Sequence, residues 1–529
     1  MQEQFYNVLA SFSALYISYK YFVAVDELGH QWVIPGVVLI DVVMLFCLNK
    51  ISKGSNGVST NYRPAVSSGV FLSLIVPLTH MGELVALVRN EDLESMVARL
   101  WLSLASILPV AVRWLWVNRK NSMSVLLLLI LSYGIIFRHL DPLVALSFLS
   151  TDFVVIWMGL RHIPVLLPKS FTFGELALVL QLLIGLSHRF VFGFLEKSWL
   201  AGKHFPLLLF IHTLLVTVIA ATCVIYLTSA HSSMWKFISI YSIFAAAAFF
   251  FLQLILPENP LVWLIYYISD SCNRVFLIVV WLILMAITLI WVANQSLALD
   301  QIQAIKGKGC CNHQETSNSK TQDTTPVTTR LIARKMFHIF IVLVYVPGLM
   351  VDPHLLLLAS IAVFGVFVVV EAARALQVPV MGTYINDMQK LFVDERDQGH
   401  VFLTHIYLLL GMSLPLWMSP SLLFSKRASP ETYAGVLALG VGDTVACLTG
   451  RAFGKLQWPG SKKTIEGTTC SILVQMILGA IGFYAGVFNI TSILTVSIGV
   501  TLTALAEAFT DQIDNLVLPL FLYPILCFS

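Results

Sequence analysis

The sequence predicts an all-α, polytopic integral membrane protein, with roughly 15–17 transmembrane helices judged by the lengths of its apolar runs. Of its 529 residues, 58% are hydrophobic and only 12% are charged, whereas about a quarter of a soluble protein is charged. The mean hydropathy is +0.83. Many stretches run for about 18 residues or more with few charges, which is the length that crosses the hydrocarbon core of a bilayer.

The predicted spans fall into two blocks separated by one polar segment. Residues 298–330 are rich in Thr, Ser, Gln and Lys and low in aromatics, which is typical of a mobile loop. The chain therefore divides into an N-terminal transmembrane block (1–297), a polar cytoplasmic loop (298–330) and a C-terminal transmembrane domain (331–529). The spans expected in the first block are 6–25, 33–49, 66–89, 99–117, 122–138, 142–160, 174–194, 204–228, 236–256 and 275–297. Those expected in the second are 336–350, 354–372, 402–419, 433–450, 469–488, 491–508 and 514–528.

Composition also limits the partners. The formal net charge is only +3 and the chain has no basic tract of the nucleic-acid-binding type, so we expect no nucleic-acid partner. The eight cysteines are scattered without metal-ligand spacing, which indicates small buried apolar residues. The first apolar run lacks a basic leader and a clear cleavage site, which predicts a retained anchor.

Threading the second block through a membrane places its ionisable residues on one face. The segment ending in Lys335, the loop 373–401, the loop 451–468 and the acids at 511–514 are each two spans apart, so they share a side. An excess of lysine and arginine marks the cytoplasmic side. We therefore expect the chemistry to lie at the cytoplasmic face.

The most informative segment is the apolar run that contains GVGDT, residues 440–444. An aspartate inside such a run costs about 2.5–3.5 kcal/mol on insertion scales, so Asp443 is a candidate functional residue. Gly440 and Gly442 allow the backbone to approach a phosphate. A carboxylate combined with phosphate oxygens suits Mg²⁺, which makes Asp443 a candidate metal ligand. The alternative is close helix packing through small residues around one paired acid.

A polar turn, WPGSKKTIEGT (458–468), follows this run. Pro459 and Gly460 predict the turn itself. Lys462 and Lys463 supply positive charge for phosphates, although basic residues flanking a span are also common on the cytoplasmic side. The next span begins near Thr464, and helix N-termini attract anions. The predicted nucleotide-binding residues of this turn are Lys462, Lys463, Thr464, Glu466 and Gly467, and Glu466 is a second candidate metal ligand.

Three further clusters could contribute, each with an ordinary structural alternative. In ARKMFH (333–338), Arg334 and Lys335 are candidate nucleotide-binding residues and His338 a candidate catalytic residue at a membrane entry, where an ordinary basic flank is also common. In FVDERD (392–397), Asp394 and Glu395 could bind metal or act as a base, or belong to a solvated loop. The last cluster, EAFTDQIDN (507–515), places Glu507, Asp511 and Asp514 on one helix face, which suggests a cation site, a base or a capped helix end.

Known nucleotide motifs are missing. The nearest approach to a phosphate-binding P-loop, GRAFGKL (450–456), has three spacers instead of four and no Ser or Thr after the lysine. The protein-kinase motif set is also absent. Any nucleotide site in this sequence is therefore of another type.

The strings ARKMFH, FVDERD, LTHIYLLLGMSLP, YAGVLALGVGDTVA, WPGSKKTIEGT and QIDNLVLPL resemble dolichol kinases, the eukaryotic members of the polyprenol kinase family. They cover most of residues 331–529. The resemblance implies transfer of phosphate from CTP to dolichol, with Mg²⁺, at the cytoplasmic face of the endoplasmic reticulum membrane. The product would be the lipid carrier for N-glycosylation, mannosylation and GPI-anchor synthesis. The partners it implies are dolichol, CTP and the lipid bilayer.

With this reaction, Lys462 and Lys463 are expected to hold the CTP phosphates, while Asp443 and Glu466 are expected to hold Mg²⁺. The base near the lipid hydroxyl is left open among His338, Asp394, Glu395 and Asp514. The lysine turn and the GVGD string also resemble CTP-dependent phytol and diacylglycerol kinases and phosphatidate cytidylyltransferases, so another lipid remains an alternative.

Two other classes fit less well. Intramembrane aspartyl proteases carry a GxGD string but need a second aspartate, usually after tyrosine, in the preceding span; the chain has no Tyr-Asp pair and no acid in 402–419. A secondary transporter would place ionisable residues at the middle of the membrane. Here they gather at one face.

Overall fold

The computed structural model describes residues 142–195, 205–228, 233–309, 325–389, 399–419, 427–488, 490–509 and 513–528, with residues 61–63, 72, 75, 76, 78–80, 83 and 422. Within these residues the regular structure is helical, and only an isolated bridge joins Gln457 and Thr464. The predicted all-α fold is confirmed. The first five predicted spans lie outside the described residues, apart from a few positions of 66–89.

The chain is a polytopic membrane protein, as predicted. Seven described helical segments are long and apolar enough to cross a membrane, by length and composition. They are Pro206–Leu227, Met234–Ile255, Cys272–Trp291, Arg334–Val351, Pro353–Ala375, Pro430–Phe453 and Ile465–Tyr484. Several helices are apolar but shorter, and two of the short helices, α12 (Pro260–Ser269) and α16 (Met381–Gln389), lie between predicted spans. Their brevity explains why hydropathy did not indicate them.

The helices group into two compact units. The first unit consists of Met1–His212 with Asp397–Ser529, and the second is Thr213–Arg396. The helices of the first unit are α7 (Pro142–Leu166), α8 (Phe173–Leu195), α17 (Thr404–Met418), η6 (Pro430–Tyr433), η7 (Val436–Asp443), α19 (Thr444–Phe453), α20 (Ile465–Tyr484), α21 (Ile490–Phe509) and α22 (Asp514–Leu526). Helix α10 (Phe205–Leu227) begins in the first unit and continues into the second, which also holds α11 (Met234–Ile255), α12, α13 (Cys272–Gly309), α14 (Thr325–Val351), α15 (Pro353–Ala375) and α16.

In the second unit, helix extends into the segment predicted as a loop, 298–330. Helix α13 continues to Gly309 and α14 begins at Thr325. The two helices pack together, and the Trp281 indole donates a hydrogen bond of 3.2 Å to the Val344 carbonyl oxygen. The predicted division of the chain at 298–330 into two transmembrane blocks stays a prediction.

Side chains cap the helices where the sequence provides the right residues. Thr172 and Glu175 cap the start of α8 reciprocally: the Thr172 N–H donates to Glu175 at 2.9 Å, and the Glu175 N–H donates to the Thr172 hydroxyl at 3.3 Å. Asp352 caps α15 by accepting the Leu355 N–H at 3.0 Å, and Pro353 follows at the first helical position.

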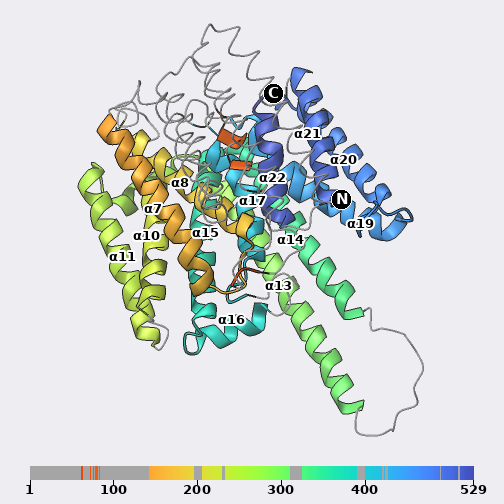
Figure 1. Cartoon of the computed structure of the whole chain (residues 1–529), viewed down its shortest axis with the longest axis horizontal. Coiled ribbons are helices and arrows are strands. Elements are labelled where there is room, and N and C mark those ends of the chain that lie inside the picture. The colour runs from red at the N-terminus through yellow and green to blue at the C-terminus, as the bar shows by residue number, and fades with distance from the viewer. Residues whose placement is uncertain are drawn as a thin grey trace, which may run out of the picture. The chain divides into compact units, whose positions relative to one another are not determined.

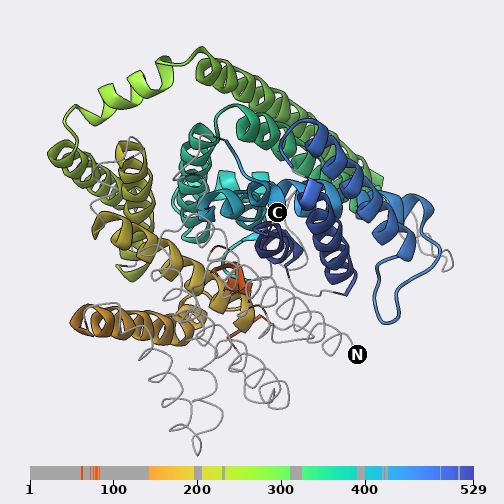
Figure 2. The same ribbon diagram turned by 90° about the horizontal axis from the view of Figure 1, so that it is seen from above.

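Helix η7 lies at the centre of the C-terminal part of the first unit. It contacts α17, α19, α20, α21 and α22. Helix α20 also packs along α19 and α21, and α22 packs along α17 and α21 (Figures 1 and 2, blue). This arrangement brings the end of α21 and the start of α22 near the end of η7, which is where the charged residues lie.

Candidate nucleotide and metal site

The segment around GVGD forms a π-helix, η7, which passes directly into α19 at Thr444. A π-helical turn is rare and often marks a functional site. The Ser471 hydroxyl of α20 donates a hydrogen bond of 2.9 Å to the Gly442 carbonyl oxygen. Gly440 and Gly442 are buried, and the Gln475 amide of α20 lies against Gly442. These contacts give Gly442 a packing role, and the approach of phosphate to the backbone of both glycines stays a prediction.

The turn that follows α19 is compact. Gly460 has a φ of +77°, and the Ser461 N–H donates to the Trp458 carbonyl oxygen at 3.0 Å. Proline at the second position and a left-handed glycine at the third are the requirements of a type II turn, which Trp458–Ser461 meets. The Trp458 N–H then donates to the Lys463 carbonyl oxygen at 3.0 Å. The chain thus doubles back and presents Lys463 just before α20.

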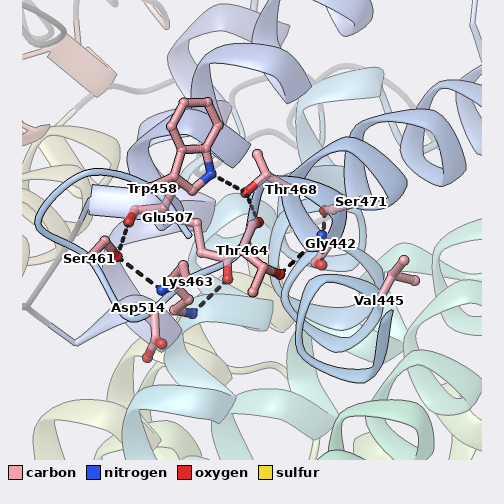
Figure 3. A network of polar contacts seen from close by, with 12 residues as sticks. Gly442, Val445, Trp458, Ser461, Lys463, Thr464, Thr468, Ser471, Glu507 and Asp514 are labelled. Carbon is pink, nitrogen blue, oxygen red and sulfur yellow. Dashed lines mark hydrogen bonds and ion pairs between the residues drawn. The ribbon is translucent and has the colours of Figure 1, made fainter. Parts of the chain in front are cut away.

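Side chains fasten this turn to the helices beside it (Figure 3). The Ser461 hydroxyl donates to the Ala508 carbonyl oxygen of α21 at 2.6 Å. The Trp458 indole donates to the Thr468 hydroxyl of α20 at 3.0 Å, and its ring lies 5.4 Å from that of Phe509. The position of Lys463 is therefore fixed by both α20 and α21.

Lys463 is the centre of a charged cluster. Its ammonium donates a hydrogen bond of 2.7 Å to the Glu507 carboxylate; the Lys463 side chain is 38% exposed and that of Glu507 only 5%. Burial alone lowers the pKa of the Lys463 ammonium, but Glu507, Asp443 and Asp514 together raise it above the ordinary lysine value. Lys463 therefore stays charged at neutral pH. The structure thus brings together Asp443, Lys463 and Asp514, three residues that the sequence analysis proposed from separate motifs.

The two adjacent lysines point in different directions. Lys463 turns inward to Glu507, while Lys462 is exposed. The sequence analysis assigned both to the CTP phosphates. In the structure only Lys463 is held among carboxylates, and Lys462 is left on the outer side of the turn.

Glu466 organises the same turn from its other side. Its carboxylate accepts hydrogen bonds from the backbone N–H groups of Lys455 (3.0 Å) and Leu456 (3.1 Å). Its oxygens already hold the turn, so its predicted role as a metal ligand has a structural alternative.

Replacing Glu466 by glutamine separates these two roles. Glutamine keeps one carboxamide oxygen for the turn but is a poor ligand for Mg²⁺. If Glu466 holds the turn, Glu466→Gln should raise the KM for the nucleotide several-fold and leave the Mg²⁺ concentration for half-maximal rate unchanged. Titrating Mg²⁺ at saturating nucleotide measures the second quantity, and a large increase in it would assign Glu466 to the metal.

Thr464 and Gly467 lie where α19 and α20 approach closely. The Thr464 hydroxyl caps α20 by accepting the Gly467 N–H at 3.3 Å. A Cβ at position 467 would lie 2.6 Å from the Ala446 carbonyl oxygen of α19. Because that atom is backbone, only glycine fits there.

We therefore expect Gly467→Ala to push α19 and α20 apart, at a cost of about 1–3 kcal/mol in the free energy of unfolding. Thermal unfolding in detergent measures this loss. Thr469→Ala on the exposed side of the same helix is the matched control and should change stability little. Equal stability of the two variants would contradict the close approach.

The residues around Lys463 suit a divalent cation bound together with phosphate. Three acidic side chains, those of Asp443, Glu507 and Asp514, lie near one ammonium, so acids outnumber the cation in this cluster. The buried polar atoms without a hydrogen-bond partner in the described residues include two at this site. They are the hydroxyl of Thr444, which follows Asp443 in sequence, and the carbonyl oxygen of Gln475, whose amide lies against Gly442. Within the described part of the chain, no three His, Cys, Asp or Glu side chains are arranged to hold a metal by themselves. Mg²⁺ usually takes one or two carboxylates and completes its shell with phosphate and water.

The other predicted residues lie elsewhere. Arg334, Lys335 and His338 are on α14 in the second unit, where His338 is buried and its Nδ1 lies 2.9 Å from the Arg334 carbonyl oxygen. Asp394 and Glu395 lie outside the described residues. Their proposed part in the chemistry stays a prediction.

Several residues of the site were not singled out from the sequence. Glu507 was predicted only as part of one acidic helix face with Asp514, which is wrong because α21 ends at Phe509 and α22 begins at Asp514. Its pairing with Lys463 joins positions 44 apart in the chain. Thr444 directly follows Asp443, so the GVGDT string contained that signal. Ser471 and Gln475 gave none, because polar residues inside an apolar span also serve ordinary helix packing.

Fold and site together define a polytopic membrane protein with a buried carboxylate cluster and a paired lysine where apolar helices end. Comparison with known proteins identifies the family: the sequence profile of dolichol kinase matches residues 146–410, half of the chain, and the chain belongs to the dolichol kinase family. This match ends before the Asp443 and Lys463 cluster, which rests on the geometry above.

Comparison with individual proteins supports the same family. The chain is 34% identical to dolichol kinase of Homo sapiens over 374 residues, which are 68% of this chain and 65% of the human protein. It is 31% identical to dolichol kinase EVAN of Arabidopsis thaliana (51% of this chain, 43% of that protein) and 27% identical to dolichol kinase of Saccharomyces cerevisiae (50% and 44%). The chain thus spans less than two thirds of the length of these relatives. No solved structure matches it.

Proposed function

We propose that this protein transfers the γ-phosphate of CTP to the hydroxyl of dolichol, giving CDP and dolichyl phosphate, at the cytoplasmic face of the endoplasmic reticulum membrane. Membership in the dolichol kinase family supports the reaction class and the lipid. The observation that carries the site is the Lys463 ammonium held among three carboxylates where α21 ends and α22 begins. CTP as donor and the cytoplasmic orientation rest on the sequence motifs and the lysine-rich turn.

Lys463 and Asp443 have complementary roles in this proposal. Phosphoryl transfer depends mainly on positioning and on neutralising charge at the phosphates. Lys463, fixed by the turn and by Glu507, places a positive charge at the nucleotide phosphates. Asp443 and the hydroxyl of Thr444 would hold Mg²⁺, which neutralises phosphate charge when bound. Lys462, on the outer side of the turn, adds a further charge for the nucleotide.

We assign the role of base to Asp514 in this proposal. Within the first unit, Asp514 lies near Lys463. It is at the start of α22 and is partly exposed. In the transfer step the dolichol oxygen bonds to the γ-phosphorus and the bond from that phosphorus to the β-phosphate oxygen breaks. The hydroxyl proton passes to the Asp514 carboxylate.

The test is transfer of label from γ-labelled CTP or ATP, with Mg²⁺, to dolichol, phytol or diacylglycerol in liposomes. The expected result is label moving from CTP to dolichol, and greatly slowed in Asp514→Asn. Transfer to phytol or diacylglycerol would keep a CTP-dependent lipid kinase and change its substrate. Absence of transfer to any lipid by folded protein would overturn the proposal and favour a transporter.

A further inference from the structure

Residues 451–462, which we call the rim, expose two large apolar side chains. Phe453, at the end of α19, is 72% exposed and Leu456 is 62% exposed. Their backbone is held in place: the Gly454 N–H donates to the Gly450 carbonyl oxygen at 3.0 Å, and Glu466 accepts the Leu456 N–H. These side chains are thus presented outward by a fixed turn.

The rim is also basic. Arg451, Lys455 and Lys462 are all exposed, and no aspartate or glutamate occurs from residue 451 to residue 464. The nearest acid in the chain after the rim, Glu466, directs its carboxylate to backbone N–H groups. Apolar side chains beside cations are the combination that binds an anionic membrane surface.

The position of the rim in the chain favours the same partner. It connects the segments Pro430–Phe453 and Ile465–Tyr484, both long and apolar enough to cross a membrane, so it must lie where the two helices leave the bilayer. One face of α20 continues the apolar surface, since Leu473, Ile477, Ile481 and Tyr484 are each more than half exposed. Their spacing of four, four and three residues puts them on one side of the helix, which faces lipid.

We propose that the rim docks into the headgroup layer of the membrane that this chain spans, with Phe453 and Leu456 entering the interface and Arg451 and Lys455 contacting lipid phosphates. Docking holds the adjoining turn, and with it Lys463, at the height of the lipid headgroups. The inference does not depend on the proposed reaction, because it concerns only the contact between the rim and lipid.

An environment-sensitive fluorescent amino acid placed at position 456 tests this in nanodiscs of full-length protein. Position 457 is the matched control, because Gln457 is the exposed polar neighbour of Leu456. We expect lipids labelled with a headgroup-depth quencher to quench position 456 more than position 457, and aqueous iodide to show the opposite order. On phosphatidylserine-containing discs, Arg451→Gln and Lys455→Gln should each shift the docking equilibrium by about fivefold.

Three outcomes would overturn the proposal. Equal quenching at the two positions, with full access to iodide, would place the rim in water. Equal docking on neutral and anionic discs would remove the role of the cations. A photo-crosslink joining position 456 of two copies would assign the exposed apolar surface to a subunit interface.

Discussion

Asp443→Asn should reduce the rate of phosphate transfer on the order of 10²–10³-fold, the size of a lost electrostatic contact in a transition state. Asparagine has nearly the same shape but lacks the charge that would hold Mg²⁺ against the phosphates. Because it also removes one of three neighbouring carboxylates, the variant should fold at least as stably as the parent. Labelled transfer and thermal unfolding, measured on one preparation, check both expectations.

Glu431→Gln is the matched control for this substitution. Glu431 is a buried acid at the start of the same span, Pro430–Phe453, well before Asp443, and accepts a hydrogen bond of 2.7 Å from the Ser419 hydroxyl. Its neutralisation should leave the rate of transfer near that of the parent. Equal loss of rate in both variants would show that neutralising any buried acid of this span impairs the protein, and Asp443 would lose its assigned role.

Lys463→Met should have the second large effect, and it should act on both stability and activity. Loss of the ammonium leaves the carboxylate of Glu507 buried without its cation. Breaking a buried pair costs about 3–5 kcal/mol, and because the lysine side chain is partly exposed we expect about 1–3 kcal/mol here. The rate should fall on the order of 10²-fold or more because the charge at the phosphates is gone.

A second substitution separates the two effects. In the double variant Lys463→Met with Glu507→Gln, the uncompensated carboxylate is removed, so unfolding should return toward that of the parent while the rate stays low. Recovery of the rate in this double variant would show that Lys463 acts only through stability. Lys462→Met is the comparison for stability, since the exposed neighbour should change the unfolding temperature little.

Sequence reasoning located most helices in the described part of the chain. The predicted span 402–419 became α17, 491–508 became α21 and 514–528 became α22, each within a few residues. Long apolar runs can be read from composition because the bilayer requires a minimum length of apolar helix. The prediction of helices from hydropathy missed short helices such as α12 and the polar start of α14, because neither contains an apolar run long enough to cross a membrane.

The sequence by itself determined the membrane fold, the isolated acid at 443 and the lysine turn. A helix in lipid needs a long apolar run, so both the run and a single charge inside it can be recognised directly in the sequence. Tertiary structure decided which residues meet. In the folded protein Lys463 pairs with Glu507, whereas Lys462 is exposed. Glu466 accepts hydrogen bonds from the turn, and Gly467 lies where α19 and α20 approach closely. Such partners are set by how α19, α20, α21 and α22 pack, and contacts between residues far apart in the chain depend on that packing and leave no local pattern in the sequence.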